Sequence, residues 1–194
     1  MPGRPRAFDA DRALDRALEV FWRKGYEGAS LSDLTRAMRI NRPSLYAAFG
    51  DKEKLFRRAL DRYAEGPAAY VQHALNEPTA RAVVERLLYC TADAMSDLRN
   101  PRGCLLVQGA LACGDDASCV KRELTSRREA GEEALCQRLK RAKSEGDLPP
   151  DSDPVALARY VATVSQGMAV QAAGGASRAE LRKIADLAMR ALPK

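Results

Sequence analysis

The sequence predicts an all-α fold, and three observations support this. Apolar residues recur at intervals of three and four along most of the chain, as they do on one face of an α-helix. Runs of alternating valine, isoleucine or threonine, which would indicate strands, do not occur. The 194 residues are 46% hydrophobic, 30% charged and 6% aromatic, which is typical of a soluble helical globule. Disordered, collagen-like and membrane classes are excluded on these grounds.

The positions of the helices follow from the apolar stripes. Leu14, Leu18, Phe21 and Trp22 predict a first helix over residues 9–24, which stops at Gly25. Four further stripes predict a helix that begins near Asp51, a long charged helix and two final helices. These stripes are Phe56, Ala59, Leu60 and Tyr63; Val120, Leu124, Leu135 and Leu139; Val161, Val164 and Met168; and Leu181, Ile184, Ala185 and Ala188.

Glycine and proline separate these helices, and together they indicate about nine of them. The predicted stops are Gly66-Pro67, Glu77-Pro78, Asn100-Pro101-Arg102-Gly103, Leu148-Pro149-Pro150 and Gly174-Gly175. Charge is also uneven, because residues 1–65 carry 14 basic and 10 acidic side chains in a chain of net charge +6. This modest basic excess permits a polyanionic partner without requiring one.

Residues 28–56 contain two very short helices and the start of a third. Ser30 followed by Asp33 is a capping pattern, so the first short helix covers about residues 31–38. Helices of this length are not stable alone. We therefore expect them to pack on the first helix of the chain.

The second short helix follows a turn at residues 39–41. Asn41 is a good N-cap, and Pro43 lies in the first turn, where its missing N–H does no harm. This helix covers about residues 42–49. Two short helices joined by a three-residue turn form a helix-turn-helix unit, whose second helix lies in the major groove of DNA.

The N-terminal end of this second helix offers side chains that can read DNA. Arg42 can pair in two-pronged fashion with guanine, and Ser44 and Tyr46 can donate to phosphate. Near its start the next helix carries Lys52, whose charge opposes the helix dipole unless an anion binds there. Lys52 is therefore interpreted as a clamp on the DNA backbone, the alternative being a solvated surface charge.

Two arginines near the N-terminus carry a further prediction. Arg4 and Arg6 form either a frayed tail or an arm that reaches the minor groove of DNA. We expect residues 1–50 to form a DNA-binding domain. Residues 51–194 form a larger second domain, connected through the helix that begins at Asp51.

Residues 25–55 resemble the N-terminal DNA-binding domain of TetR-type transcriptional regulators. The residues that carry the resemblance are Gly25-Tyr26 at the end of the first helix, then Leu45-Tyr46, Phe49, Lys52-Glu53 and Leu55. Two positions depart from the usual pattern, because Thr35 stands where alanine is common and Arg39 stands at the turn where glycine is common. A positive φ at Arg39 would strain or reshape the turn. Alternatively, Arg39 gains a phosphate contact.

The resemblance implies a two-domain helical chain that dimerises through its last two helices and holds a ligand pocket in its second domain. The DNA contacts that it implies are Ser30, Arg42, Pro43, Ser44, Tyr46 and Lys52; Arg39 and Asn41 of the turn complete the candidate set. In this interpretation residues 161–173, which carry no charge, form a penultimate helix buried by its own domain and by the partner. The final helix, with Leu187, completes a four-helix interface. The alternative is that both helices pack within a monomer.

Five cysteines are an odd number in a chain too long to need disulfides, so a reducing cytoplasm is expected. Cys104 follows Pro101 at the start of a helix, where its thiolate would be stabilised, and Arg99 and Arg102 would act in the same direction. Some TetR-type regulators that sense electrophiles or oxidants resemble this chain in a Gly-Cys-Leu at a comparable place. Cys104 is thus a candidate sensor thiol, or else a small buried apolar residue.

Metal binding and catalysis have little support in the sequence. No two cysteines are spaced as a metal-binding pair, and His73 is the single histidine. Cys113 and Cys119 flank two aspartates and are interpreted as ordinary loop thiols, although a soft metal or a redox disulfide is an alternative. No nucleophile elbow, phosphate loop or paired-carboxylate motif is present. We therefore expect no cofactor, no metal and no enzymatic activity.

Location and function follow from these observations. The N-terminus lacks the apolar core of a secretory signal, and the longest uncharged run is too polar to span a bilayer, so a cytoplasmic protein without a membrane partner is expected. The sequence predicts a homodimeric transcriptional regulator, and a repressor is favoured over an activator. This repressor leaves a palindromic operator when a small molecule binds or a thiol is modified. The alternatives are a non-specific DNA-coating protein and a helical thiol-based redox or metal-handling protein.

Overall fold

The computed structural model describes residues 8–111 and 118–193, and within them it contains ten α-helices and no strand. This confirms the all-α prediction, with one helix more than the nine or so expected. No helix of the described residues combines the length and the apolar character that crossing a membrane requires. The helices are α1 (Ala10–Gly28), α2 (Leu31–Met38), α3 (Arg42–Phe49), α4 (Lys52–Glu65), α5 (Tyr70–Leu75), α6 (Ala80–Met95), α7 (Leu105–Leu111), α8 (Ser118–Ser144), α9 (Pro154–Ala173) and α10 (Arg178–Arg190).

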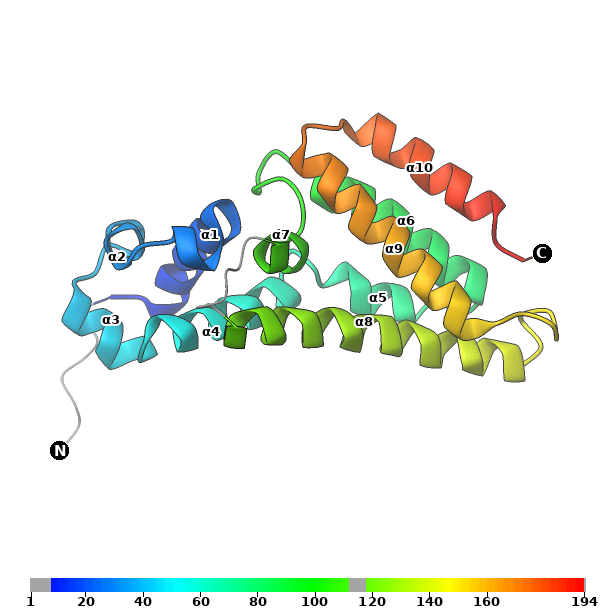
Figure 1. The fold of residues 1–194 in the computed structure, drawn as a ribbon, viewed down its shortest axis with the longest axis horizontal. Helices are drawn as coiled ribbons and strands as arrows, with labels where there is room; N and C mark the ends of the chain where they lie inside the picture. The colour runs from blue at the N-terminus through cyan, green and yellow to red at the C-terminus, as the bar shows by residue number, and fades with distance from the viewer. Residues whose placement is uncertain (1–7, 112–117, 194) are drawn as a thin grey trace.

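Helices α1 to α4 gather at one end of the molecule, as Figure 1 shows in blue and cyan. They share a core in which Phe21, Leu34, Leu45 and Phe56 are fully buried. The short helices α2 and α3 contribute apolar residues to this core and pack beside α1 and α4. As the sequence predicts, tertiary packing rather than helix propensity stabilises them.

The first helix breaks where the sequence predicts its end. Gly25 has φ 71° and ψ 176°, which are not helical, and only one more turn follows before Gly28. Asp9 caps the other end by accepting hydrogen bonds from the backbone N–H groups of Asp11 and Arg12. The break at Gly25 lets the chain turn directly into α2.

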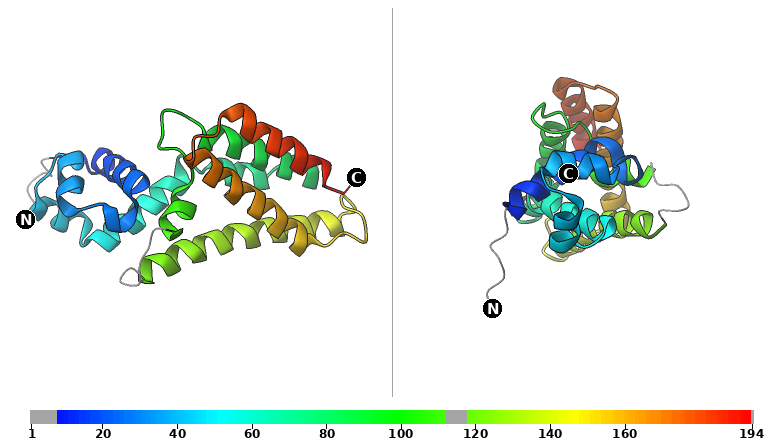
Figure 2. Two further views of the ribbon diagram at one scale, coloured as in Figure 1. Left: turned by 45° about the horizontal axis from the view of Figure 1, so that its top comes forward. Right: turned by 90° about the vertical axis from the view of Figure 1, so that its left-hand side faces the viewer.

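The second half of the molecule is built around two long helices. Helices α8 and α9 pack against each other, and α6 and α10 cover α9, an arrangement that the left view of Figure 2 displays. Leu88, Val161 and Leu181 are fully buried in this second core. An ion pair of 2.7 Å between Arg182 and Asp93 ties α10 to α6.

The two cores meet at α7 and at the beginning of α8. Leu105, Val120 and Leu124 are buried in the core of α1 to α4, although they belong to the second half of the sequence. Helix α4 lines the same core through Tyr63. The first four helices are thus attached to the rest by packed apolar side chains, while the division at residues 50 and 51 stays a prediction.

Candidate DNA-binding surface and interior cavity

Helix α2 begins at the capping box that the sequence predicts. The hydroxyl of Ser30 accepts a hydrogen bond of 3.0 Å from the N–H of Asp33, and the carboxylate of Asp33 accepts one of 3.2 Å from the N–H of Ser30. The ammonium of Lys24 in α1 lies 3.0 Å from the same carboxylate. The hydrogen bond from Lys24, followed by those from Ser30, lowers the pKa of Asp33 to about 2. This carboxylate therefore joins α2 to α1 while it caps α2.

The turn between α2 and α3 contains a residue in the left-handed region. Arg39 has φ 58° and ψ 43° and is the one described residue other than glycine with a positive φ. Its N–H donates to the carbonyl of Arg36, and the N–H of Ile40 donates to the carbonyl of Thr35. The conformation closes α2, as the sequence predicts, and leaves the Arg39 side chain exposed.

Helix α3 presents two of its predicted reading residues, Arg42 and Tyr46, to solvent, and the third, Ser44, is half-buried. Its first turn is capped by Asn41, whose side-chain oxygen accepts a hydrogen bond of 2.8 Å from the N–H of Ser44. The inner face is buried through Leu45 and Phe49. The outer face exposes Arg42, Pro43 and Tyr46, the last at 49% of its surface. A side chain that points outward from a rigid, capped helix is well placed to reach a base edge.

The Arg42 side chain is oriented by a residue of the neighbouring helix. Its Nη2 donates a hydrogen bond of 3.2 Å to the hydroxyl of Ser32 in α2. The guanidinium thus lies across the gap between the two helices. Ser32 is not among the residues that the sequence predicts for DNA binding, although it lies in the first turn of α2, beside the capping residue Ser30.

Lys52 lies at the start of α4, directly after the N-cap Asp51. Its ammonium lies 4.5 Å from the centre of the Tyr26 ring, a cation–π contact. Burial lowers the pKa of Lys52, and the charge of Glu27 opposes this shift. Lys52 is half-buried rather than fully solvated, and its charge is held at a helix N-terminus.

The candidate residues from Ser30 to Lys52 therefore come together on α2, α3, the turn between them and the start of α4, at the end of the molecule opposite to the C-terminus (Figure 1). Arg4 and Arg6 lie outside the described residues.

A cavity of about 380 Å³ lies between α4 and helices α5 to α9. Most of its lining is apolar, and its polar groups include Tyr63, Tyr70, Thr91 and Cys104. Burial raises the pKa of both tyrosines. The hydroxyl of Tyr70 accepts a hydrogen bond of 3.2 Å from the hydroxyl of Thr91. The arrangement suits a mainly apolar molecule with one or two polar atoms.

Cys104 lies immediately before α7, which fits the predicted position near a helix start. The hydroxyl of Tyr63 donates a hydrogen bond to its sulfur over 3.5 Å. Arg99, which the sequence places near this thiol, instead forms an ion pair of 2.8 Å with Asp97. The Cys104 thiol therefore lines the cavity and contacts Tyr63 of α4.

The other described cysteines, at positions 90, 119 and 136, are also free thiols. Cys119 donates to the carboxylate of Glu53 over 3.3 Å, and this contact joins the start of α8 to α4. Cys113 lies outside the described residues, so a pair with Cys119 is not tested. Among the described residues, no three His, Cys, Asp or Glu side chains gather as a metal site would require.

Comparison with protein families assigns both halves of the chain. Residues 13–59 match the family described as "Bacterial regulatory proteins, tetR family". Residues 81–187 match the "Tetracyclin repressor-like, C-terminal domain". The chain belongs to the TetR family. This confirms the resemblance that the motif around Tyr46 and Lys52 indicates, and the protein is a helix-turn-helix transcriptional regulator.

Individual members of the TetR family are similar to this chain along its whole length. The HTH-type transcriptional repressor ComR of Escherichia coli K12 is 35% identical over 194 residues, which are 99% of this chain and 92% of ComR. The TetR-family regulator CifR, solved as a cysteine mutant with 26 bp double-strand operator DNA, is 44% identical with a TM-score of 0.94. That match covers 98% of this chain and 100% of CifR. A putative TetR regulator from Rhodococcus is 42% identical, with a TM-score of 0.65 and coverage of 95% and 100%.

Proposed function

We propose that this TetR-family chain is a homodimeric repressor that binds a palindromic operator through α3. The observation that carries the proposal is the capped α3, whose exposed face bears Arg42, Pro43 and Tyr46 above the buried Leu45 and Phe49. CifR, which is similar over the whole chain, was solved with operator DNA, and this supports operator binding by this chain.

In this proposal the candidate residues divide into two groups. Arg42 faces a base edge in the major groove, where arginine pairs with guanine. Ser44 and Tyr46 donate to phosphates. Lys52 and Arg39 also contact phosphates, and these contacts fix the register of the protein on DNA. Ser30, Asn41 and Pro43 lie beside them at the helix starts, and Arg4 and Arg6 reach the minor groove.

The proposed dimer is supported by an uncharged exposed face on α9 and by an exposed leucine on α10. Tyr160 and Val170 of α9 are 37% and 47% exposed, and Leu187 of α10 is 63% exposed. The small residues Thr163 and Gly167 lie between them on the exposed face of α9. A second copy of the chain would cover these side chains. A two-fold dimer in turn presents two copies of α3 to two half-sites one helical turn, or a multiple of it, apart.

The proposed signal acts in the cavity of about 380 Å³. A small, mainly apolar molecule, or modification of the Cys104 thiol, would change the packing of Tyr63 in α4. Helix α4 also carries Lys52, so a shift of α4 changes the spacing of the two recognition helices in the dimer. The protein acts by binding, without catalysis, in the cytoplasm.

The test is selection of bound sequences from random duplex DNA, with reduced protein and after mild oxidation. We expect a palindromic motif from the reduced sample. Arg42→Ala should weaken binding by about 1–3 kcal/mol and relax specificity at one base in each half-site. Arg81→Ala, which removes an exposed arginine at the start of α6, serves as the matched control and should bind normally.

The outcomes separate the parts of the proposal. A palindrome from the reduced sample alone assigns the signal to thiols, and Cys104→Ser then decides whether this thiol carries it. A palindrome from both samples dismisses oxidation and leaves a small apolar ligand. Enrichment of no sequence in either sample contradicts the proposed function.

A further inference from the structure

Trp22, the one tryptophan of the chain, connects α1 to the segment before α7. Its side chain is 6% exposed, and its indole N–H donates a buried hydrogen bond of 3.1 Å to the carbonyl of Gly103. The two residues are 81 positions apart in the sequence. A buried indole N–H requires a partner, so this bond ties α1 to Gly103.

The backbone of Gly103 also lies close to α6 and α9. Its φ is +83°, and a Cβ at this position would lie 2.9 Å from the carbonyl oxygen of Ala169 in α9. Its own N–H donates to the carbonyl of Met95 at the end of α6 over 3.1 Å. The backbone at Gly103 is therefore held between α1, α6 and α9.

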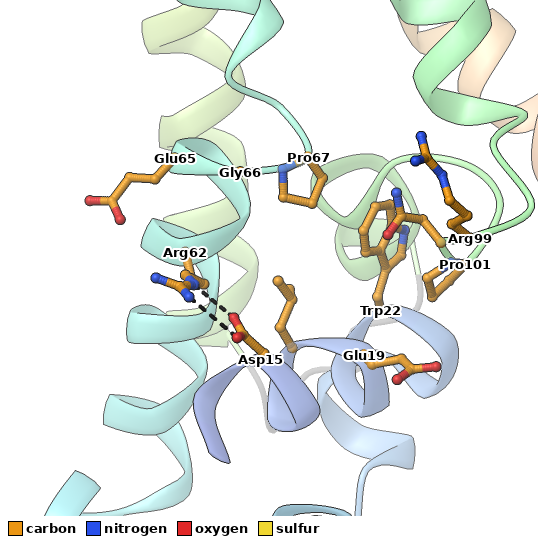
Figure 3. A pocket seen from close by; sticks show the side chains of 11 residues that line it. Asp15, Glu19, Trp22, Arg62, Glu65, Gly66, Pro67, Arg99 and Pro101 are labelled. Atoms are coloured by element: carbon orange, nitrogen blue, oxygen red, sulfur yellow. Dashed lines mark hydrogen bonds and ion pairs between the residues drawn. The ribbon is translucent and has the colours of Figure 1, made fainter. Parts of the chain in front are cut away.

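The residue that follows Gly103 lines the cavity. Cys104 accepts the hydrogen bond of Tyr63, and the Tyr63 ring packs edge-to-face on Trp22 with ring centres 4.8 Å apart at 86°. Figure 3 shows a second pocket, lined by Trp22, in which the Trp22 side chain extends from α1 toward Pro101. Two adjacent residues, Gly103 and Cys104, thus contact α1 and α4 through one pair of aromatic rings.

We propose that Trp22 is a positioning residue through which the state of the cavity reaches α1. The inference rests on the proposed function and adds a second route to the one through α4. Any group that displaces Cys104 moves the carbonyl of Gly103. Helix α1 then either moves with this carbonyl or loses the hydrogen bond that Trp22 donates to it. Because Lys24 of α1 is paired with Asp33 of α2, the displacement reaches the helix-turn-helix unit.

The test replaces Cys104 with methionine, whose longer side chain disturbs the contact with Tyr63. In Cys104→Met we expect the emission of Trp22 to move to longer wavelength and the affinity for the selected operator to fall about tenfold. Trp22→Phe keeps an aromatic ring and removes the N–H donor. In a Trp22→Phe background, Cys104→Met should lower the affinity less than twofold further, because coupled sites are not additive.

Two controls accompany these variants. Cys90→Met introduces the same side chain on α6, away from Trp22, and should change neither emission nor affinity. Phe56→Leu loosens the same core, and Phe56 packs on Phe21 and Tyr26 rather than on Trp22. In that background the full tenfold effect of Cys104→Met should remain.

The proposal is overturned by any of three results. In the first, Cys104→Met lowers the operator affinity equally in the wild-type and Trp22→Phe backgrounds. In the second, it lowers the operator affinity without a change in Trp22 emission. In the third, it changes neither the operator affinity nor the emission. If wild-type protein selects no DNA sequence, the proposed function fails, and the Trp22 emission alone then decides whether Cys104 and α1 are coupled.

Discussion

At the scale of single residues, Arg39 shows how a local cost is tolerated at a candidate binding surface. Its φ of 58° is a conformation that glycine adopts freely and that a side chain makes unfavourable by about 1 kcal/mol. Its exposed side chain makes no buried contact that offsets this cost. A phosphate contact of the Arg39 side chain in the DNA complex would offset this conformational cost.

We therefore expect Arg39→Gly to stabilise the free protein and to weaken its binding to DNA. The gain of about 1 kcal/mol corresponds to a rise of roughly 2–4 °C in the melting temperature. The loss of one phosphate contact per chain should lower the salt dependence of binding by about one unit for each chain. Thermal unfolding and titration at several salt concentrations measure the two effects.

Arg36→Ala is the matched control, since it removes a neighbouring exposed arginine from a helical position. It should not raise the melting temperature. An Arg39→Gly protein that binds DNA with unchanged affinity and salt dependence would exclude the phosphate contact.

At the scale of helices, caps rather than length define α2 and α3. Each helix has eight residues, so a lost cap affects a large part of it. The capping box of α2 depends on an ionised Asp33, which also pairs with Lys24. The pKa of this carboxyl is about 2 in the folded protein, against an ordinary value of 3.8.

This difference predicts how the stability of α2 depends on pH. Because the folded pKa is the lower one, the contribution of Asp33 is complete above pH 3.8 and is lost as the pH falls toward 2. Asp33→Asn should therefore unfold at a lower temperature than wild type at pH 7, and the difference should shrink below pH 3.8. Thermal unfolding of both proteins between pH 7 and pH 2.5 measures this. A difference that stays constant over the whole range would contradict the assignment.

At the scale of the whole molecule, the proposed function depends on a second copy of the chain. The buried core accounts for the inner faces of α9 and α10 but leaves Tyr160, Val170 and Leu187 exposed on their outer faces. Scattered exposed apolar residues are normal, whereas the uncharged face that runs along α9 beside the exposed Leu187 is typical of an interface.

We expect Leu187→Glu to convert the proposed dimer to monomers, because it would place a carboxylate in the buried interface. Affinity for the palindrome should then fall about 100-fold or more, since the two half-sites are no longer bound together. Leu98→Glu makes the same change in a leucine that is 80% exposed outside α9 and α10, and it should have no effect. Sedimentation and operator titration measure both variants. A Leu187→Glu protein that remains dimeric would place the interface elsewhere.

The sequence alone predicted the helical fold, the caps of α2 and α3, the turn at Arg39 and the TetR resemblance. All of these depend on side chains within a few residues of one another, such as Ser30 with Asp33 or Asn41 with Ser44. Local hydrogen bonds and helical periodicity are determined by residues that lie close together in the sequence. The roles of individual DNA contacts stay predictions.

Only the tertiary structure decided which distant residues act together. Trp22 bonds to Gly103 across 81 positions, Tyr63 meets Cys104 across 41, and Arg42 reaches Ser32 in another helix. The sequence placed Cys104 near a helix start but gave no sign that it lines a cavity beside Tyr63. The physical reason is that side-chain packing depends on how helices cross, and the periodicity of each helix shows its apolar face without showing which helix will cover it.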